Sequence, residues 1–312
     1  MEARPAQESG LLSRLLRLVE SPATRIVAVA VLLVLVATAV DSGGMQKAAA
    51  DADWSLIWPA LAMVPLQVLA AAVLWRRLAL SVDPALTLAE STRAVLGSLS
   101  VSIWTPARAG DFAARPTLMP RGSRRTLAVA VGAENLLRLP VPLLLAAGAS
   151  WMVPFPGHLV FAGVCLVTGL AAALLFASPR LSTRLAEAMR VGRHAEFLAT
   201  VPAGSLVVGH GLRYGFLVAQ FGLVALAMSG AAEPGAWAVL AACCVILAAK
   251  LVAPLLNFAE LGIREGASLV ALGAIGFSAE SALQASLVLY AINVLLPAAV
   301  GAFFWLRRTR ES

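Results

Sequence analysis

The sequence has few of the charged residues that keep a soluble protein in water. Asp, Glu, Lys and Arg make up 13% of its 312 residues, against about 25% in an average soluble domain. Hydrophobic residues make up 60%, and the mean hydropathy is +0.85. This composition excludes an ordinary soluble protein and indicates an integral membrane protein.

Residues that commonly carry chemistry are also scarce, with three cysteines and three histidines in the whole chain. The cysteines lie in apolar runs, so we expect neither a disulfide framework nor a metal site. No G-x-x-x-x-G-K-[ST] loop occurs, which excludes an ATP-driven pump. We therefore expect no cofactor and no enzymatic activity. The acidic pair in 51–53 leaves open one alternative, a membrane transferase acting on a polyprenyl-linked sugar.

Alternation of apolar and polar residues at strand period is missing, so we expect an all-α polytopic membrane bundle. A helix of about 18 or more apolar residues can cross the hydrocarbon layer of a membrane. The apolar runs are at 26–40, 56–75, 126–150, 158–177, 203–229, 236–253 and 281–306.

The net charge of +7 does not form a soluble basic patch of the kind that binds nucleic acid. The basic residues instead lie in short connections beside the apolar runs, which marks cytoplasmic faces and places both termini in the cytoplasm. With seven runs alone the C-terminus would lie outside, so the region 254–277 is expected to supply another crossing. The prediction is about eight crossings.

We divide the chain into a cytoplasmic amphipathic lead at 1–25, one transmembrane domain at 26–306 and a basic cytoplasmic tail at 307–312. The lead alternates leucines with arginines, which is typical of a helix lying on an anionic leaflet. A plain cytoplasmic helix stays an alternative. The sequence Ala37-Thr38-Ala39 also leaves open the cleavage of the first run by signal peptidase.

Two regions interrupt the apolar pattern. The stretch 86–104 contains charges and serines and is expected to enter the membrane and return, with TPARAGDFAAR (105–115) at its tip. The stretch 257–266 is expected to be irregular. Broken backbone persists at membrane depth only where protein or a wet cavity satisfies it. Each region joins an arginine, a carboxylate and a glycine, which favours an inverted repeat with a site near the midplane.

Charged residues also occur inside the apolar runs. Glu134 and Arg138 stand four residues apart, so we expect them to pair on one helical face, with a kink at Pro140. The pair could serve a headgroup or proton site, or only fix helix packing. His210 could carry a coupling proton, although a packing role is the alternative. Small residues in the runs permit close helix contacts, and the oligomeric state is left open.

A helix that begins near Gly262 would present free amide groups and the positive end of its dipole to an anion such as phosphate. Arg264 would add a forked donor for phosphate oxygens, and Glu265 would hold that arginine. The alternative is an ordinary cytoplasmic loop.

These motifs resemble the transmembrane region of lysylphosphatidylglycerol synthases, whose stand-alone members are flippase-like membrane proteins. GIREGASL (262–269) and the last run with Asn293 and Pro297 are similar to the closing part of that family. TPARAGDFAAR is similar to its P-x-x-x-G-[DE] element, which a membrane carboxylate, here Glu134, follows.

Two positions depart from the pattern of that family. Asn135 stands where arginine usually follows the membrane carboxylate, and Ala259-Glu260 replaces a glycine-rich approach to the R-E-G element. Headgroup preference is expected to differ accordingly. The 312 residues leave no room for the aminoacyl-transferring domain of the bifunctional synthases.

The resemblance implies a translocase of the cytoplasmic membrane that moves a phospholipid or lipid-linked headgroup between leaflets through a charged groove. Its partners would be membrane lipids and no nucleic acid. The alternative is a non-transporting lipid-binding or scaffold protein that serves envelope-biosynthesis enzymes. The predicted groove residues are Arg108, Gly110, Asp111, Glu134, Arg138, Gly262, Arg264 and Glu265, with Glu134 and His210 as candidate proton carriers.

Overall fold

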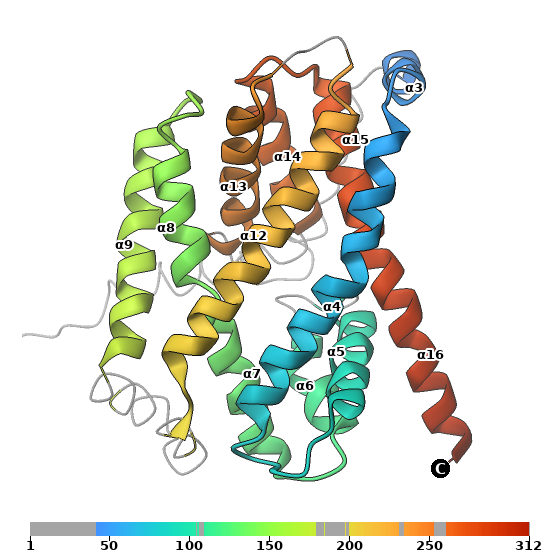
Figure 1. Cartoon of the computed structure of the whole chain (residues 1–312), viewed down its shortest axis with the longest axis vertical. Coiled ribbons are helices and arrows are strands. Elements are labelled where there is room, and N and C mark those ends of the chain that lie inside the picture. The colour runs from blue at the N-terminus through green and yellow to red at the C-terminus, as the bar shows by residue number, and fades with distance from the viewer. Residues whose placement is uncertain are drawn as a thin grey trace, which may run out of the picture.

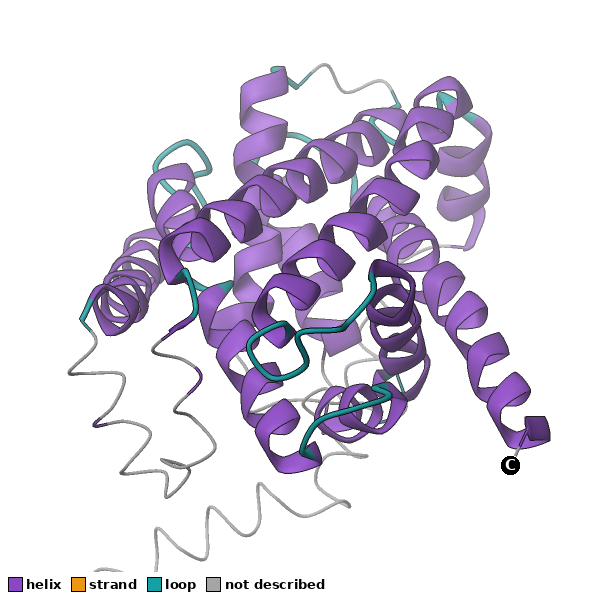
Figure 2. Cartoon of the chain, turned by 60° about the horizontal axis from the view of Figure 1, so that its bottom comes forward, coloured by secondary structure: helices purple, strands orange, loops and turns teal. Residues whose placement is uncertain are grey.

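The computed structural model describes residues 42–103, 105, 109–178, 184, 197, 200–230, 234–252 and 260–311. Every regular element in these ranges is helical, which confirms the all-α class (Figure 1). Turns and short connections join the helices (Figure 2). The expected amphipathic lead and the first apolar run lie outside the described residues.

In chain order the helices are α3 (Ser42–Ala50), α4 (Ile57–Ala79), α5 (Leu88–Ser102), α6 (Ala109–Leu118), α7 (Arg124–Leu137), α8 (Pro140–Ala149), α9 (His158–Ala177), α12 (Ala203–Ala227), α13 (Ala236–Val252), α14 (Glu260–Gly273), α15 (Ala279–Tyr290) and α16 (Leu296–Glu311). A short 3₁₀ helix (Trp54–Leu56) precedes α4, and a π-helical turn (Ala291–Leu295) joins α15 to α16.

The length and the apolar character of its helices make this a membrane bundle. Among the described residues, four helical stretches are long and apolar enough to span: Trp54–Ala79, Arg124–Ala149, His158–Ala177 and Ala279–Trp305. Large apolar side chains are exposed along the whole length of α9. A surface of this kind is stable only against lipid. Helix α12 has 25 residues and also runs the length of the bundle (Figure 1). The total of about eight crossings stays a prediction.

Helices α5 and α6 form a short hairpin within the lower half of the bundle (Figure 1). A capping box starts α5, because the Thr87 hydroxyl accepts from the Glu90 amide and the Glu90 carboxylate accepts from the Thr87 amide. At the other end Gly110 packs so closely that a methyl group there would lie 2.9 Å from the Ser102 nitrogen. The chain therefore reverses as predicted for 86–115.

The third predicted run is broken as expected. Helix α7 ends at Leu137, and α8 begins at Pro140 in its first turn. Proline lacks the amide that would continue the hydrogen-bond ladder of α7. The predicted kink just beyond Glu134 and Arg138 is confirmed.

A second short helix lies in the upper half (Figure 1). Helix α14 begins at Glu260 and ends at Gly273, and the chain turns at Gly276, whose φ is +97°. Glycine adopts that conformation without strain. The chain then continues through α15 and the π-helical turn into α16. Pro297 lacks the amide that would bond to the carbonyl of Asn293, which favours the wider turn there.

The two ends of the bundle differ in composition. Arg76 and Arg77 end α4 and Arg124 begins α7 at the lower end of Figure 1, where α16 also ends. At the other end Trp58 and Trp151 are exposed. A basic end and an aromatic end are typical of the two interfaces of a membrane protein.

Helices α5 and α16 pack against each other through glycine. A side chain at Gly301 would overlap the Leu96 carbonyl oxygen and lie 2.6 Å from its carbon. Trp305 Nε1 donates to the Gly97 carbonyl over 2.9 Å. Close backbone contact of this kind is what small residues permit in membrane bundles.

We predict that Gly301→Ala destabilises the bundle, because the added methyl group must push α16 away from the α5 backbone. Overpacking of this kind costs about 1–3 kcal/mol, measured as a lower midpoint in thermal unfolding of the purified protein. Gly163→Ala is the matched control, because a methyl group there meets nothing within 4 Å. Equal midpoints for the two variants would contradict the close contact.

Candidate functional site

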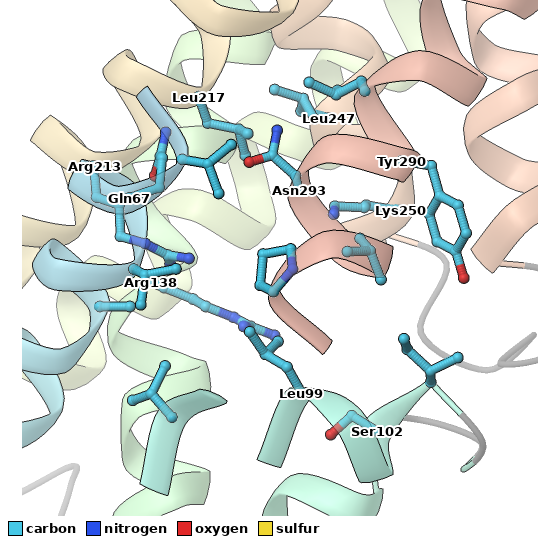
Figure 3. A pocket seen from close by; sticks show the side chains of 18 of the residues that line it. Gln67, Leu99, Ser102, Arg138, Arg213, Leu217, Leu247, Lys250, Tyr290 and Asn293 are labelled. Atoms are coloured by element: carbon cyan, nitrogen blue, oxygen red, sulfur yellow. The ribbon is translucent and has the colours of Figure 1, made fainter. Parts of the chain in front are cut away.

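A cavity of about 250 Å³ lies between α4, α5, α12, α13 and the α15–α16 helix. Its lining combines apolar side chains with five charged ones, several of which reach into the space in Figure 3. The charged lining residues are Arg115, Glu134, Arg138, Arg213 and Lys250. Charges at this depth in an apolar bundle are costly and mark candidate functional sites.

The first charged cluster joins the hairpin to α7. Arg115 of α6 donates through Nη1 to Glu134 Oε2 and through Nε to the Ser98 hydroxyl, the latter over 3.1 Å. Its guanidinium also lies 5.1 Å from the Trp75 ring centroid, a cation–π distance. Arg115 and Glu134 are both buried. Their mutual contact offsets part of the cost of removing each charge from water.

A second carboxylate supports this arginine. Asp111 is fully buried one turn before Arg115 on α6, with Oδ1 at 4.0 Å from Arg115 Nε. It accepts a 2.8 Å hydrogen bond from the Ser102 hydroxyl of α5. Gly110 packs against the end of α5, so it closes the hairpin. Arg108 lies outside the described residues.

Glu134 has a partner that the sequence did not predict. Arg115, which lies 19 positions earlier, reaches the Glu134 carboxylate, and the pair with Arg138 expected from four-residue spacing stays a prediction. Arg138 caps the end of α7 and lines the cavity.

The other arginine cluster lies on α14 and α15. Arg264 donates through Nη2 to Glu265 and through Nε to the Ser286 hydroxyl over 2.8 Å. The Ser286 hydroxyl lies 3.0 Å from Glu265 Oε1. The Arg264 guanidinium is 4.8 Å from the Tyr290 ring centroid. The elements match those of the first cluster: an arginine, a carboxylate, a serine and an aromatic ring.

The two clusters do not share one groove as predicted. Arg264, Glu265 and Gly262 are buried but do not line the cavity around Glu134. Tyr290 lines that cavity and also lies beside Arg264. Tyr290 is therefore next to both the second cluster and the cavity.

His210 is not among the residues that line the cavity. It is buried in α12, and neither ring nitrogen has a hydrogen-bond partner among the described residues. It lies on the same helix as Arg213, which does line the cavity. Its predicted proton-coupling role stays a prediction.

The model of the lysylphosphatidylglycerol synthase transmembrane region matches residues 24–301. The chain belongs to this family. No curated protein and no solved structure matches it. The match covers the hairpin, both arginine clusters and the cavity, and it makes the protein a multi-pass membrane member of a lipid-related family.

Three charged cavity residues of this family member, Arg115, Arg213 and Lys250, are absent from the predicted groove. Arg115 stands inside the quoted TPARAGDFAAR motif, one helical turn after Asp111, and that i, i+4 spacing was the available signal. Lys250 looks like an interfacial lysine near the end of a full span. The structure instead places Lys250 of α13 in the lining of the cavity.

A polar network fixes the π-helical turn beside the cavity. Asn293 Nδ2 donates to Gln220 Oε1 over 2.8 Å, and Gln220 Nε2 donates to the Ala60 carbonyl over 2.7 Å. The network joins α4, α12 and the turn, and it orients Asn293, which lines the cavity. Buried polar groups that are bonded in this way specify one packing arrangement.

We predict that Arg115→Met lowers stability by about 3 kcal/mol or more, because it leaves the Glu134 carboxylate buried without its partner. Arg115→Met combined with Glu134→Met is expected to recover most of the loss. The measurement is the thermal unfolding midpoint of each variant in one detergent. Arg77→Met, at an exposed position, is the control. If the double variant instead lost as much stability as the two single variants together, an energetic pairing of Arg115 with Glu134 would be ruled out.

Proposed function

We propose that the protein is a lipid translocase of the cytoplasmic membrane, in which a lipid headgroup passes through the cavity while its acyl or prenyl tails stay in lipid. The observation that carries the proposal is the charged cavity inside an apolar bundle, with Arg115, Arg138, Arg213, Lys250 and Glu134 in its lining. A headgroup that crosses unaided must lose its hydration at a cost of many kcal/mol. These side chains would replace that water.

The remaining lining suits the base of the tails. Val64, Val68, Leu99 and Leu217 give the cavity an apolar part. The volume of about 250 Å³ is just below the roughly 300–1,000 Å³ of sites that enclose a drug-sized ligand. A cavity of this size would take the headgroup and the base of the tails, while the rest of the tails would stay in lipid.

The proposed orientation of the protein in the membrane follows from the composition of the two ends of the bundle. The basic end, with Arg76, Arg77 and the end of α16, would face the cytoplasm by the positive-inside rule. The half-length helices α5, α6 and α14 are the elements that could rock against the long helices to open the cavity to one side at a time. Membrane lipids are then the partners, and no enzymatic step is required.

In liposomes that contain the purified protein, we predict faster exchange of a leaflet-resolved fluorescent phospholipid than in empty vesicles. Arg138→Gln and Lys250→Gln should each slow the exchange about tenfold or more, because each removes a cation that would hold the headgroup phosphate. Dithionite quenching of the outer leaflet gives the rate.

Arg77→Gln is the matched control, because Arg77 is exposed at the end of α4, and it should exchange lipid at the unmodified rate. Absence of exchange across a panel of anionic, zwitterionic and polyprenyl lipids would overturn the proposal. A non-transporting lipid-binding or scaffold role would then fit the same cavity.

A further inference from the structure

Gln67 is a buried polar residue of the cavity lining that takes no part in the charged clusters. It lies on α4, is 7% exposed and lines the cavity. Its Nε2 has no hydrogen-bond partner within the described part of the chain. A buried amide that bonds to nothing destabilises a protein, so a glutamine at this position is unfavourable for packing alone.

The face of α4 that carries Gln67 points into the bundle. Four buried residues of this helix stand three or four positions apart and so share one face: Ala60, Val64, Gln67 and Ala71. The last three of them line the cavity. Because the neighbours of Gln67 on this face are apolar, a partner for its amide must come from the cavity.

A second amide reaches the same cavity from the π-helical turn. Asn293 lines the cavity and donates through Nδ2 to Gln220 Oε1 over 2.8 Å. Its carbonyl oxygen is therefore the acceptor that Asn293 can offer to a ligand. Gln220 also donates to the Ala60 carbonyl over 2.7 Å, so the network holds the turn against the face of α4 that carries Gln67.

The two amides complement each other chemically, because Gln67 offers a donor and Asn293 an acceptor. Both lie above Arg138 in the view of Figure 3. An ionised phosphate oxygen only accepts, whereas a hydroxyl group both donates and accepts. A donor and an acceptor on neighbouring elements therefore favour a hydroxyl group, and the match does not depend on the charges of the lining.

We infer, on the basis of the proposed function, that Gln67 is a headgroup-contacting residue that selects a lipid with a hydroxyl group beyond its phosphate. Gln67 Nε2 donates to the hydroxyl oxygen, and the hydroxyl group donates to the Asn293 carbonyl. A headgroup with only hydrocarbon at that place leaves the buried amide unpaired. A site built to bond a hydroxyl group discriminates for this reason against an analogue that lacks it.

Two lipids of equal size and charge test this selection. The hydroxyethyl and propyl esters of phosphatidic acid differ only in a hydroxyl group that replaces a methyl group. Each lipid, labelled on an acyl chain, is added at low mole fraction to phosphatidylcholine liposomes that contain the full chain, and dithionite quenching gives its exchange rate. After subtraction of the rate in empty vesicles, the hydroxyethyl ester is expected to exchange about tenfold faster or more.

Gln67→Met keeps the length of the side chain and removes its amide. It should lower the ratio of the two rates about fivefold or more, because the hydroxyl group loses its donor. Its thermal unfolding midpoint should equal or exceed that of the unmodified protein, because an unpaired buried amide has been removed. Gln46→Met makes the same substitution at an exposed position of α3 and should preserve the ratio.

The other outcomes overturn the inference. Equal rates for the two esters in the unmodified protein would overturn the selection for a hydroxyl group, although exchange of both would still support the proposed function. A ratio that persists in Gln67→Met would overturn the role of Gln67. A lower unfolding midpoint in Gln67→Met would show that the protein itself bonds the amide, which also overturns that role. Exchange of neither lipid would overturn the inference, and the wider lipid panel would then decide the proposed function.

Discussion

The structure depends on the cost of placing charge in an apolar interior. A charged group without a partner is too expensive at membrane depth, and the cost falls when another charge, a hydroxyl or an aromatic face surrounds it. Arg115 and Arg264 each meet this constraint with a carboxylate, a serine hydroxyl and an aromatic ring. The helices that carry these partners must therefore approach one another closely.

Broken helices follow from the same constraint. Arg138 lies at the C-terminal end of α7, just before the break at Pro140, and lines the cavity. Close glycine contacts such as that of Gly301 with α5 keep these short elements packed.

The two arginine clusters are alike in composition and differ in setting. The cluster around Arg115 contributes directly to the cavity, while Arg264 does not line it and lies beside Tyr290, which does. The cationic residues of the lining come from α6, the end of α7, α12 and α13.

The sequence by itself determined the helical membrane class, the hairpin near Gly110 and the kink at Pro140, because apolar run length and proline act locally. The tertiary structure decided that Arg115 reaches Glu134 and that Lys250 lines the cavity. Contacts between helices far apart in the chain, such as Arg115 with Glu134, arise from packing, which no single segment of sequence encodes.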